Sequence, residues 1–112
     1  MTYAKFFQKN GQIVSFEISG HTGFSVEGED ILCAAVSSAV YMAANTITDV
    51  LNQKADIRVD DSNGYFSFSL SNMLPENEKN IAMQVVLKGL LLHLSGLEEQ
   101  YKQYLTIQLT EV

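Results

Sequence analysis

Two glycine-containing turns, each flanked by segments of alternating apolar and polar residues, constrain the fold of this chain most. Asn10-Gly11 separates residues 2–7 from residues 12–19, and Ser62-Asn63-Gly64 separates residues 55–60 from residues 65–70. A short glycine turn between alternating segments is a strong signal for a β-hairpin. Both pairs are therefore predicted to be hairpins, with one apolar face formed by Val14, Phe16 and Ile18 in the first and by Phe66, Phe68 and Leu70 in the second.

Two further segments have the composition of helices. Residues 30–51 are rich in Ala, Ser, Val and Met, and a second segment runs from Pro75 to about residue 100, although Gly89 and Gly96 weaken its continuity. Residues 104–111 alternate again, which predicts a last strand with Leu105, Ile107 and Leu109 facing the core. The order ββαββαβ predicts an α+β fold in which an antiparallel or mixed sheet packs against two helices.

Length and charge narrow the class of protein. The 112 residues suit one domain, residues 1–112, whose small core would gain stability from dimerisation. A net charge of −6 argues against a nucleic-acid interface, which needs clustered Lys and Arg. We expect no internal disulfide with one cysteine, no membrane span in the Ser- and Thr-containing residues 31–48, and a cytoplasmic location, since no secretory signal opens the sequence.

That single cysteine, Cys33, follows a glycine-rich loop that has His21 at its entrance. Asp30 is a good N-cap, which would place Cys33 in the first helical turn, where the helix dipole favours a thiolate. Gly23 and Gly28 would let the loop fold back so that His21 approaches the thiol. We interpret the pair as nucleophile and general base, with backbone N–H groups at the helix start, that of Cys33 included, holding the oxyanion.

Each of these residues also has a purely structural interpretation. Cys33 would then be a small buried side chain, and His21 a strand-end histidine bonded to a carbonyl group. Asp30 either caps the helix only or also orients His21, and Ser37, one turn beyond Cys33, either packs or hydrogen-bonds within the site. We expect His93 to be an ordinary helix histidine. No zinc pattern is present, and a redox sensor would lack a resolving cysteine.

These residues resemble the ribosomal-processing cysteine protease family, often abbreviated Prp. Gly20-His21 and the segment Gly28-Glu29-Asp30-Ile31-Leu32-Cys33-Ala34-Ala35-Val36-Ser37 are similar to its Gly-His and Gly-x-Asp-Ile-Val-Cys-Ala-Ala-Val-Ser signature. The resemblance spans nearly the whole chain. Thr22 stands where alanine is common and Leu32 replaces valine, while Glu27 and Glu29 make the loop more acidic.

The resemblance implies a cysteine endopeptidase without a cofactor or metal, acting as a homodimer. It would remove the short N-terminal extension of large-subunit ribosomal protein twenty-seven during ribosome maturation, cutting beside an aromatic pair. The loop residues would then bind substrate, with Phe24 and Val26 receiving the aromatics and Glu27, Glu29 and Asp30 meeting the lysine-rich segment downstream of the cut. A flap from Gly23 to Gly28 would close over the peptide, and Gly20 is assigned to the same substrate-binding loop.

The alternative function is a non-enzymatic, dimeric, ribosome-associated interaction module in which His21 and Cys33 only pack. The two readings differ in the reactivity of the thiol. A catalytic thiolate would react quickly with iodoacetamide at neutral pH, whereas a buried structural thiol would label only after denaturation.

Overall fold

The computed structural model describes residues 1–20, 29–70 and 77–112, with the side chains of residues 29 and 30 left out. Its elements occur in the predicted order ββαββαβ. They are β1 (Thr2–Lys9), β2 (Gln12–Ser19), α1 (Glu29–Asn45), β3 (Asp56–Asp60), β4 (Tyr65–Ser69), α2 (Glu78–Gln100) and β5 (Leu105–Glu111), with a π-helical turn η1 (Thr46–Val50) and a 3₁₀ turn η2 (Asp61–Asn63).

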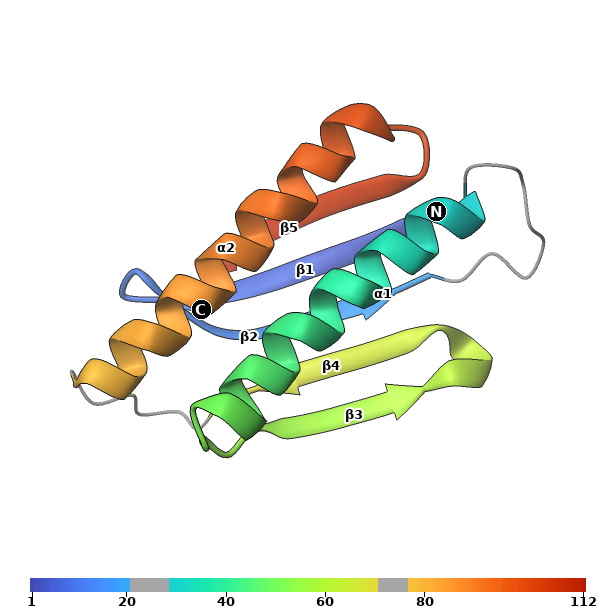
Figure 1. Cartoon of the computed structure of the whole chain (residues 1–112). Helices are drawn as coiled ribbons and strands as arrows, with labels where there is room; N and C mark the ends of the chain where they lie inside the picture. Colours follow the sequence, from blue (N-terminus) through green and yellow to red (C-terminus); the bar gives the residue numbers. More distant parts are fainter. Residues whose placement is uncertain (21–28, 71–76) are drawn as a thin grey trace.

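The strands form one mixed sheet in the order β3-β4-β2-β1-β5. The pairs β3–β4, β4–β2 and β2–β1 are antiparallel, whereas β1 and β5 are parallel. Both helices lie across the same face of this sheet, α1 nearer β3 and β4 and α2 nearer β5 (Figure 1). The predicted α+β fold with a sheet packed against two helices is confirmed.

Both predicted hairpin turns are present, and glycine serves the same purpose in each. Asn10 and Gly11 have φ angles of 51° and 78°, the left-handed pair that a two-residue hairpin turn requires. Gly64 has a φ of 60° and follows η2, in which the Asp60 side chain accepts a hydrogen bond from the Asn63 N–H. Local chemistry alone therefore accounts for both connections.

The first hairpin differs from its prediction at a β-bulge. The register shifts between Phe7 and Gln8, so Ile13 rather than Val14 is fully buried. Ile13 pairs with Gln8 of β1, and its backbone N–H and carbonyl hydrogen-bond to the Gln84 side chain of α2. The Gln84 side-chain oxygen accepts from the Ile13 N–H at 2.7 Å, and its nitrogen donates to the Ile13 carbonyl at 2.9 Å. A buried glutamine thereby satisfies two backbone groups and joins α2 to the sheet.

A stack of aromatic rings forms the centre of the core. Phe16 lies 5.4 Å from Phe6, 5.2 Å from Phe68 and 6.0 Å from Phe66, measured between ring centroids. These residues come from three neighbouring strands and point toward the helices. Leu109 of β5 is an exception to the predicted core, because β5 is an edge strand and half of the Leu109 side chain is exposed.

The first helix ends differently from the predicted single helix over residues 30–51. Helix α1 changes at Thr46 into the π-helical turn, in which the Leu51 N–H donates to the Thr46 carbonyl at 2.9 Å. The Thr46 and Thr48 hydroxyls donate to carbonyls four residues earlier, a competing bond that bends helices. Asn52 then adopts a left-handed φ of 54° and stops the helix.

Helix α2 is continuous through Gly89 and Gly96. Asn77 caps it, accepting from the Asn80 N–H at 2.9 Å, and Glu78 lies in its first turn. By length and composition alone, the helical stretches Ile31–Val50 and Glu78–Gln100 could each cross a membrane, and core helices of globular proteins meet the same criteria. Here both pack one flank against the sheet and leave the other uncovered (Figure 1).

Candidate active site

A cavity of about 130 Å³ opens between α1 and the tip of the β3–β4 hairpin. Its floor comes from the ends of β1 and β2, one wall from α1, and the other wall from β3, η2 and β4. The described residues that line it are Thr2, Ile18, Gly20, Cys33, Val36, Ser37, Val40, Tyr41, Val59, Asp61, Gly64, Tyr65 and Phe66. The predicted nucleophile therefore lies at the edge of a hollow into which another molecule can reach.

Cys33 is half-buried on the wall formed by α1 and is not in a disulfide. Ser37 and Tyr41 follow it at intervals of four residues, so the three side chains share one face of the helix and line the same cavity. Ser37 therefore lies beside the same cavity as Cys33. Tyr41 was not predicted, although the same spacing of four residues would have identified it.

The start of α1 corrects two predictions. The helix begins at Glu29, so Asp30 is its second residue and not its N-cap, and Cys33 is its fifth. Among the described residues, the N–H groups of Glu29, Asp30 and Ile31 then have no partner within the helix, because an α-helix leaves its first donors unpaired. The Cys33 N–H lies within the helical ladder and is not an available oxyanion donor.

Gly20 ends the floor of the cavity, and its place there explains why it is glycine. Its φ is +95°, a conformation that L side chains rarely adopt. A Cβ atom at this position would lie 2.1 Å from the Met1 carbonyl oxygen and 3.2 Å from the Thr2 Cα. Backbone of β1 therefore occupies the space that any other side chain would need.

Several predicted site residues cannot be placed. His21, Gly23, Phe24, Val26, Glu27 and Gly28 lie outside the described residues, and for Glu29 and Asp30 only the backbone is described. Among the predicted residues, the structure brings together Gly20, Cys33 and Ser37.

The wall opposite Cys33 was not predicted from the sequence. The Phe66 and Tyr41 rings meet edge to face with centroids 5.3 Å apart, which joins this wall to α1. At its tip, the Asp60 carboxylate accepts hydrogen bonds from the Ser62 hydroxyl and the Asn63 amide, both at 2.6 Å. These two bonds lower the pKa of Asp60 below its ordinary value and hold the turn that carries Asp61.

Other candidate chemistry lies elsewhere or is not found. Among the described residues, no group of three or more His, Cys, Asp and Glu side chains is arranged to hold a metal ion. His93 lines a separate groove between α1 and α2 and not the cavity beside Cys33. The chemistry of the described site therefore centres on the thiol.

Comparisons with known proteins point to one family. Residues 1–106 match the family described as cysteine protease Prp. The ribosomal processing cysteine protease Prp of Bacillus subtilis is 30% identical over 95 residues, which is 85% of this chain and 84% of that protein. The protein of the same description from Staphylococcus aureus is 27% identical over 93 residues, or 83% of each chain.

Solved structures show the same fold. The crystal structure of SMU.848 from Streptococcus mutans has a TM-score of 0.88 and 26% identity, covering 100% of this chain and 96% of that one. The structure of Prp from S. aureus in complex with a substrate peptide has a TM-score of 0.85 and 22% identity, covering 98% and 100%. With its thiol beside a cavity and a family match that spans most of its residues, this chain belongs to the Prp family of cysteine proteases.

Proposed function

We propose that this protein is an endopeptidase in which His21 activates Cys33 to cut a peptide bond. The observation that carries the proposal is that Cys33 and Gly20, the residue directly before His21, line one cavity. His21 lies twelve positions before Cys33 in the sequence, and the end of β2 and the first turns of α1 meet at this cavity. We therefore propose that His21, the next residue in the sequence after Gly20, acts on this thiol.

The proposed reaction uses a covalent intermediate. His21 accepts the thiol proton as the Cys33 sulfur attacks the scissile carbonyl carbon, and it then donates that proton to the departing amine. Water hydrolyses the resulting thioester and restores the thiol. Because helix side chains lean toward the N-terminus of the helix, the Cys33 sulfur lies on the side of the free N–H groups, which would stabilise the oxyanion.

We further propose that the substrate is the N-terminal extension of large-subunit ribosomal protein twenty-seven, cut during ribosome maturation in the cytoplasm. The curated relatives are described as ribosomal processing proteases, and the S. aureus protein of the same fold was crystallised with a substrate peptide. The net charge of −6 favours a basic partner over a nucleic acid.

Incubation of the purified protein with the extended ribosomal protein tests this proposal. We expect one new N-terminus, identified by mass spectrometry, and complete inhibition by one equivalent of iodoacetamide on Cys33. The same ribosomal protein without its extension serves as the control and should remain uncut. Lack of cleavage together with slow, denaturation-dependent labelling of Cys33 would instead support the non-enzymatic interaction module.

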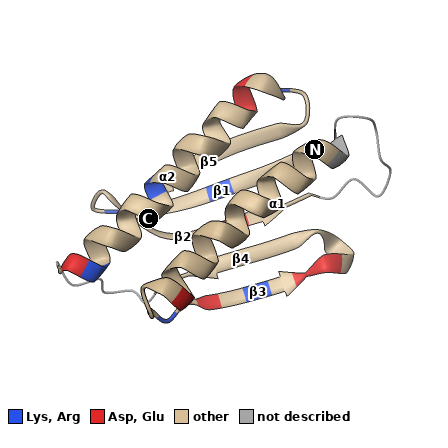
Figure 2. Cartoon of the chain, in the orientation of Figure 1, with Lys and Arg blue, Asp and Glu red and all other residues tan. Residues whose placement is uncertain are grey.

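We also propose that two copies associate through the outer faces of α1 and α2. A groove of about 830 Å³ runs between these helices, and no charged residue lines it among the residues described. Met42 and Val85 line it although 68% of each side chain is exposed in the single chain. Figure 2 shows no charged residue along α1 over the described positions between Ile31 and Asn45. An uncharged surface of this kind is typical of a protein interface.

Gly89 supports the same interface. Glycine inside a helix costs about 1 kcal/mol relative to alanine, and, apart from the backbone of α2 around it, no atom of the described residues lies within 4 Å of a Cβ built at Gly89. Packing within one chain therefore does not require this glycine. It lines the groove, where the lack of a side chain would let a second copy approach closely.

Replacing Met42 by lysine is expected to convert the dimer to a monomer, because the charge would be buried in an uncharged interface. Light scattering after gel filtration should give a mass near that of two 12.4 kDa chains for the wild type and one chain for the variant. Val112→Lys, at a residue that is 63% exposed and outside the groove, is the matched control and should stay dimeric. A monomeric wild type at micromolar concentration would contradict the proposal.

A further inference from the structure

The cavity beside Cys33 combines an apolar interior with one acidic residue. Val59 and Phe66 come from the β3–β4 hairpin, and Tyr41 faces them from α1. Val59 points to the helix side of the sheet, since it pairs with buried Phe66, yet it remains 47% exposed. Apolar surface is therefore left uncovered within reach of the thiol.

Among the described residues that line this cavity, Asp61 alone has a charged side chain. It is exposed on η2, and no ion pair or side-chain hydrogen bond of Asp61 occurs in the described part of the chain. Asp60 beside it is held by Ser62 and Asn63, so the turn has a fixed shape and two negative charges. Figure 2 shows this turn as an acidic end of the hairpin.

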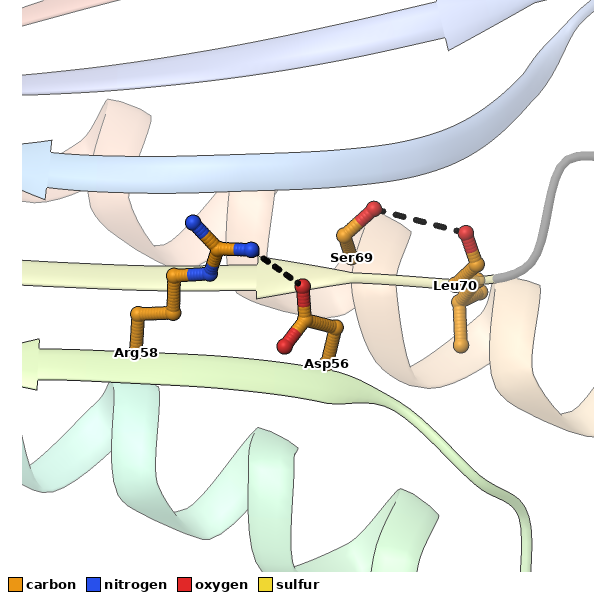
Figure 3. Close-up of polar contacts among 4 residues, drawn as sticks. All are labelled: Asp56, Arg58, Ser69 and Leu70. Atoms are coloured by element: carbon orange, nitrogen blue, oxygen red, sulfur yellow. Dashed lines mark hydrogen bonds and ion pairs between the residues drawn. The ribbon is translucent and has the colours of Figure 1, made fainter.

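Asp56 on the same hairpin provides a contrast. Its carboxylate lies 3.4 Å from the Arg58 guanidinium, and both side chains project from the sheet face that the helices leave uncovered (Figure 3). Arg58 thus provides a positive charge beside Asp56, whereas no described residue provides a positive charge beside Asp61. A ligand in the cavity can provide that positive charge.

We propose that this cavity binds a lysine or arginine side chain of the substrate peptide and that Asp61 determines this specificity. The aliphatic stem would lie against Val59 and Tyr41, and the cationic end would meet the Asp61 carboxylate at the cavity mouth. Lys and Arg are the side chains that combine a long apolar stem with a positive end. The aromatic ring of Tyr41 adds a favourable face for the cation. The inference rests on the proposed peptidase function and adds a residue preference to it.

A neutral side chain would fit this cavity less well. A neutral side chain could cover the apolar wall, but it would desolvate the Asp61 carboxylate without providing a positive charge or a hydrogen-bond donor. A glutamate would be repelled. The same cavity therefore discriminates in two ways, by attraction of a cation and by rejection of an anion.

Pairs of peptides test the inference. The two peptides of a pair differ only by lysine or norleucine at one position, and this position is moved along four residues on each side of the cut. Norleucine keeps the stem and removes the charge. We expect wild-type kcat/KM to favour lysine about fivefold at one position, and Asp61→Asn to reduce that preference to below twofold. Asp61→Lys should favour glutamate there. Asp56→Asn is the matched control and should keep the wild-type preference.

An unchanged lysine preference in Asp61→Asn, or no such preference at any position in the wild type, would overturn the inference. Failure of the proposed function would look different, since the wild type would then cleave none of the peptides. In that event, fluorescence anisotropy of the same labelled peptides on the Cys33→Ala variant, with and without Asp61→Asn, decides the inference from binding alone. The preference should also shrink at 1 M salt, where charge pairs at a cavity mouth are screened.

Discussion

The Cys33→Ala variant is expected to cleave the extended ribosomal protein about 10⁴-fold or more slowly than the wild type, because the nucleophile is gone. The variant should still fold, since only one sulfur atom is removed from a half-buried position on α1. It should also still bind the uncut substrate, because the apolar wall of the cavity is unchanged. Single-turnover cleavage followed by mass spectrometry measures the rate, and thermal unfolding checks the fold.

Two further variants show whether the loss of cleavage is specific to Cys33 and whether His21 activates it. Ser67→Ala, on the sheet face away from the cavity, should cleave at the wild-type rate. His21→Ala should lose about 10²- to 10⁴-fold in rate and should slow iodoacetamide labelling of Cys33 at neutral pH, because the thiolate would lose its base. Cleavage by Cys33→Ala at the parent rate would refute the nucleophile, and unaltered labelling in His21→Ala would refute the pairing.

The elements could be predicted from the sequence because their signals are local. Asn10-Gly11 fixes the first hairpin through its own φ angles, and Asn77 caps α2 through one side chain. The β-bulge and its partner Gln84 could not be predicted in this way. They depend on a contact between residues 71 positions apart, which no periodicity within one segment reports.

The same distinction applies to the site. Cys33 and Ser37 lie on one helix, and their spacing gives their shared face directly. Val59, Asp61 and Phe66 reach the cavity only because β4 pairs with β2 and thereby brings the hairpin tip beside α1. The wall of the cavity that the hairpin forms could therefore not be predicted without the strand order. The boundary of α1 matters as well, since a start at Glu29 changes which N–H groups are free.

Gly20→Ala is expected to be the most damaging small substitution on the cavity floor. The positive φ of 95° alone costs an alanine about 1–2 kcal/mol. The new Cβ would also meet the Met1 carbonyl oxygen at 2.1 Å, and this neighbour is backbone that begins β1. We expect a total loss of about 3 kcal/mol in the free energy of unfolding, which lowers Tm by roughly 12 °C or more. Thermal and urea unfolding measure both quantities.

Gly11→Ala separates the two causes of this loss. Gly11 also has a positive φ, 78°, but beyond its two chain neighbours no atom of the described residues lies within 4 Å of a Cβ built there, so its replacement carries the conformational cost without the clash. Gly20→Ala should therefore lose at least about 1 kcal/mol more stability than Gly11→Ala. Its kcat/KM should also fall by about tenfold or more at a temperature where both variants are folded, because a shifted strand end moves the residue after it, His21, relative to Cys33. Equal stability losses in the two variants would show that β1 yields to the added methyl group. In that case a tenfold loss of activity in Gly20→Ala alone would locate the effect in the position of His21.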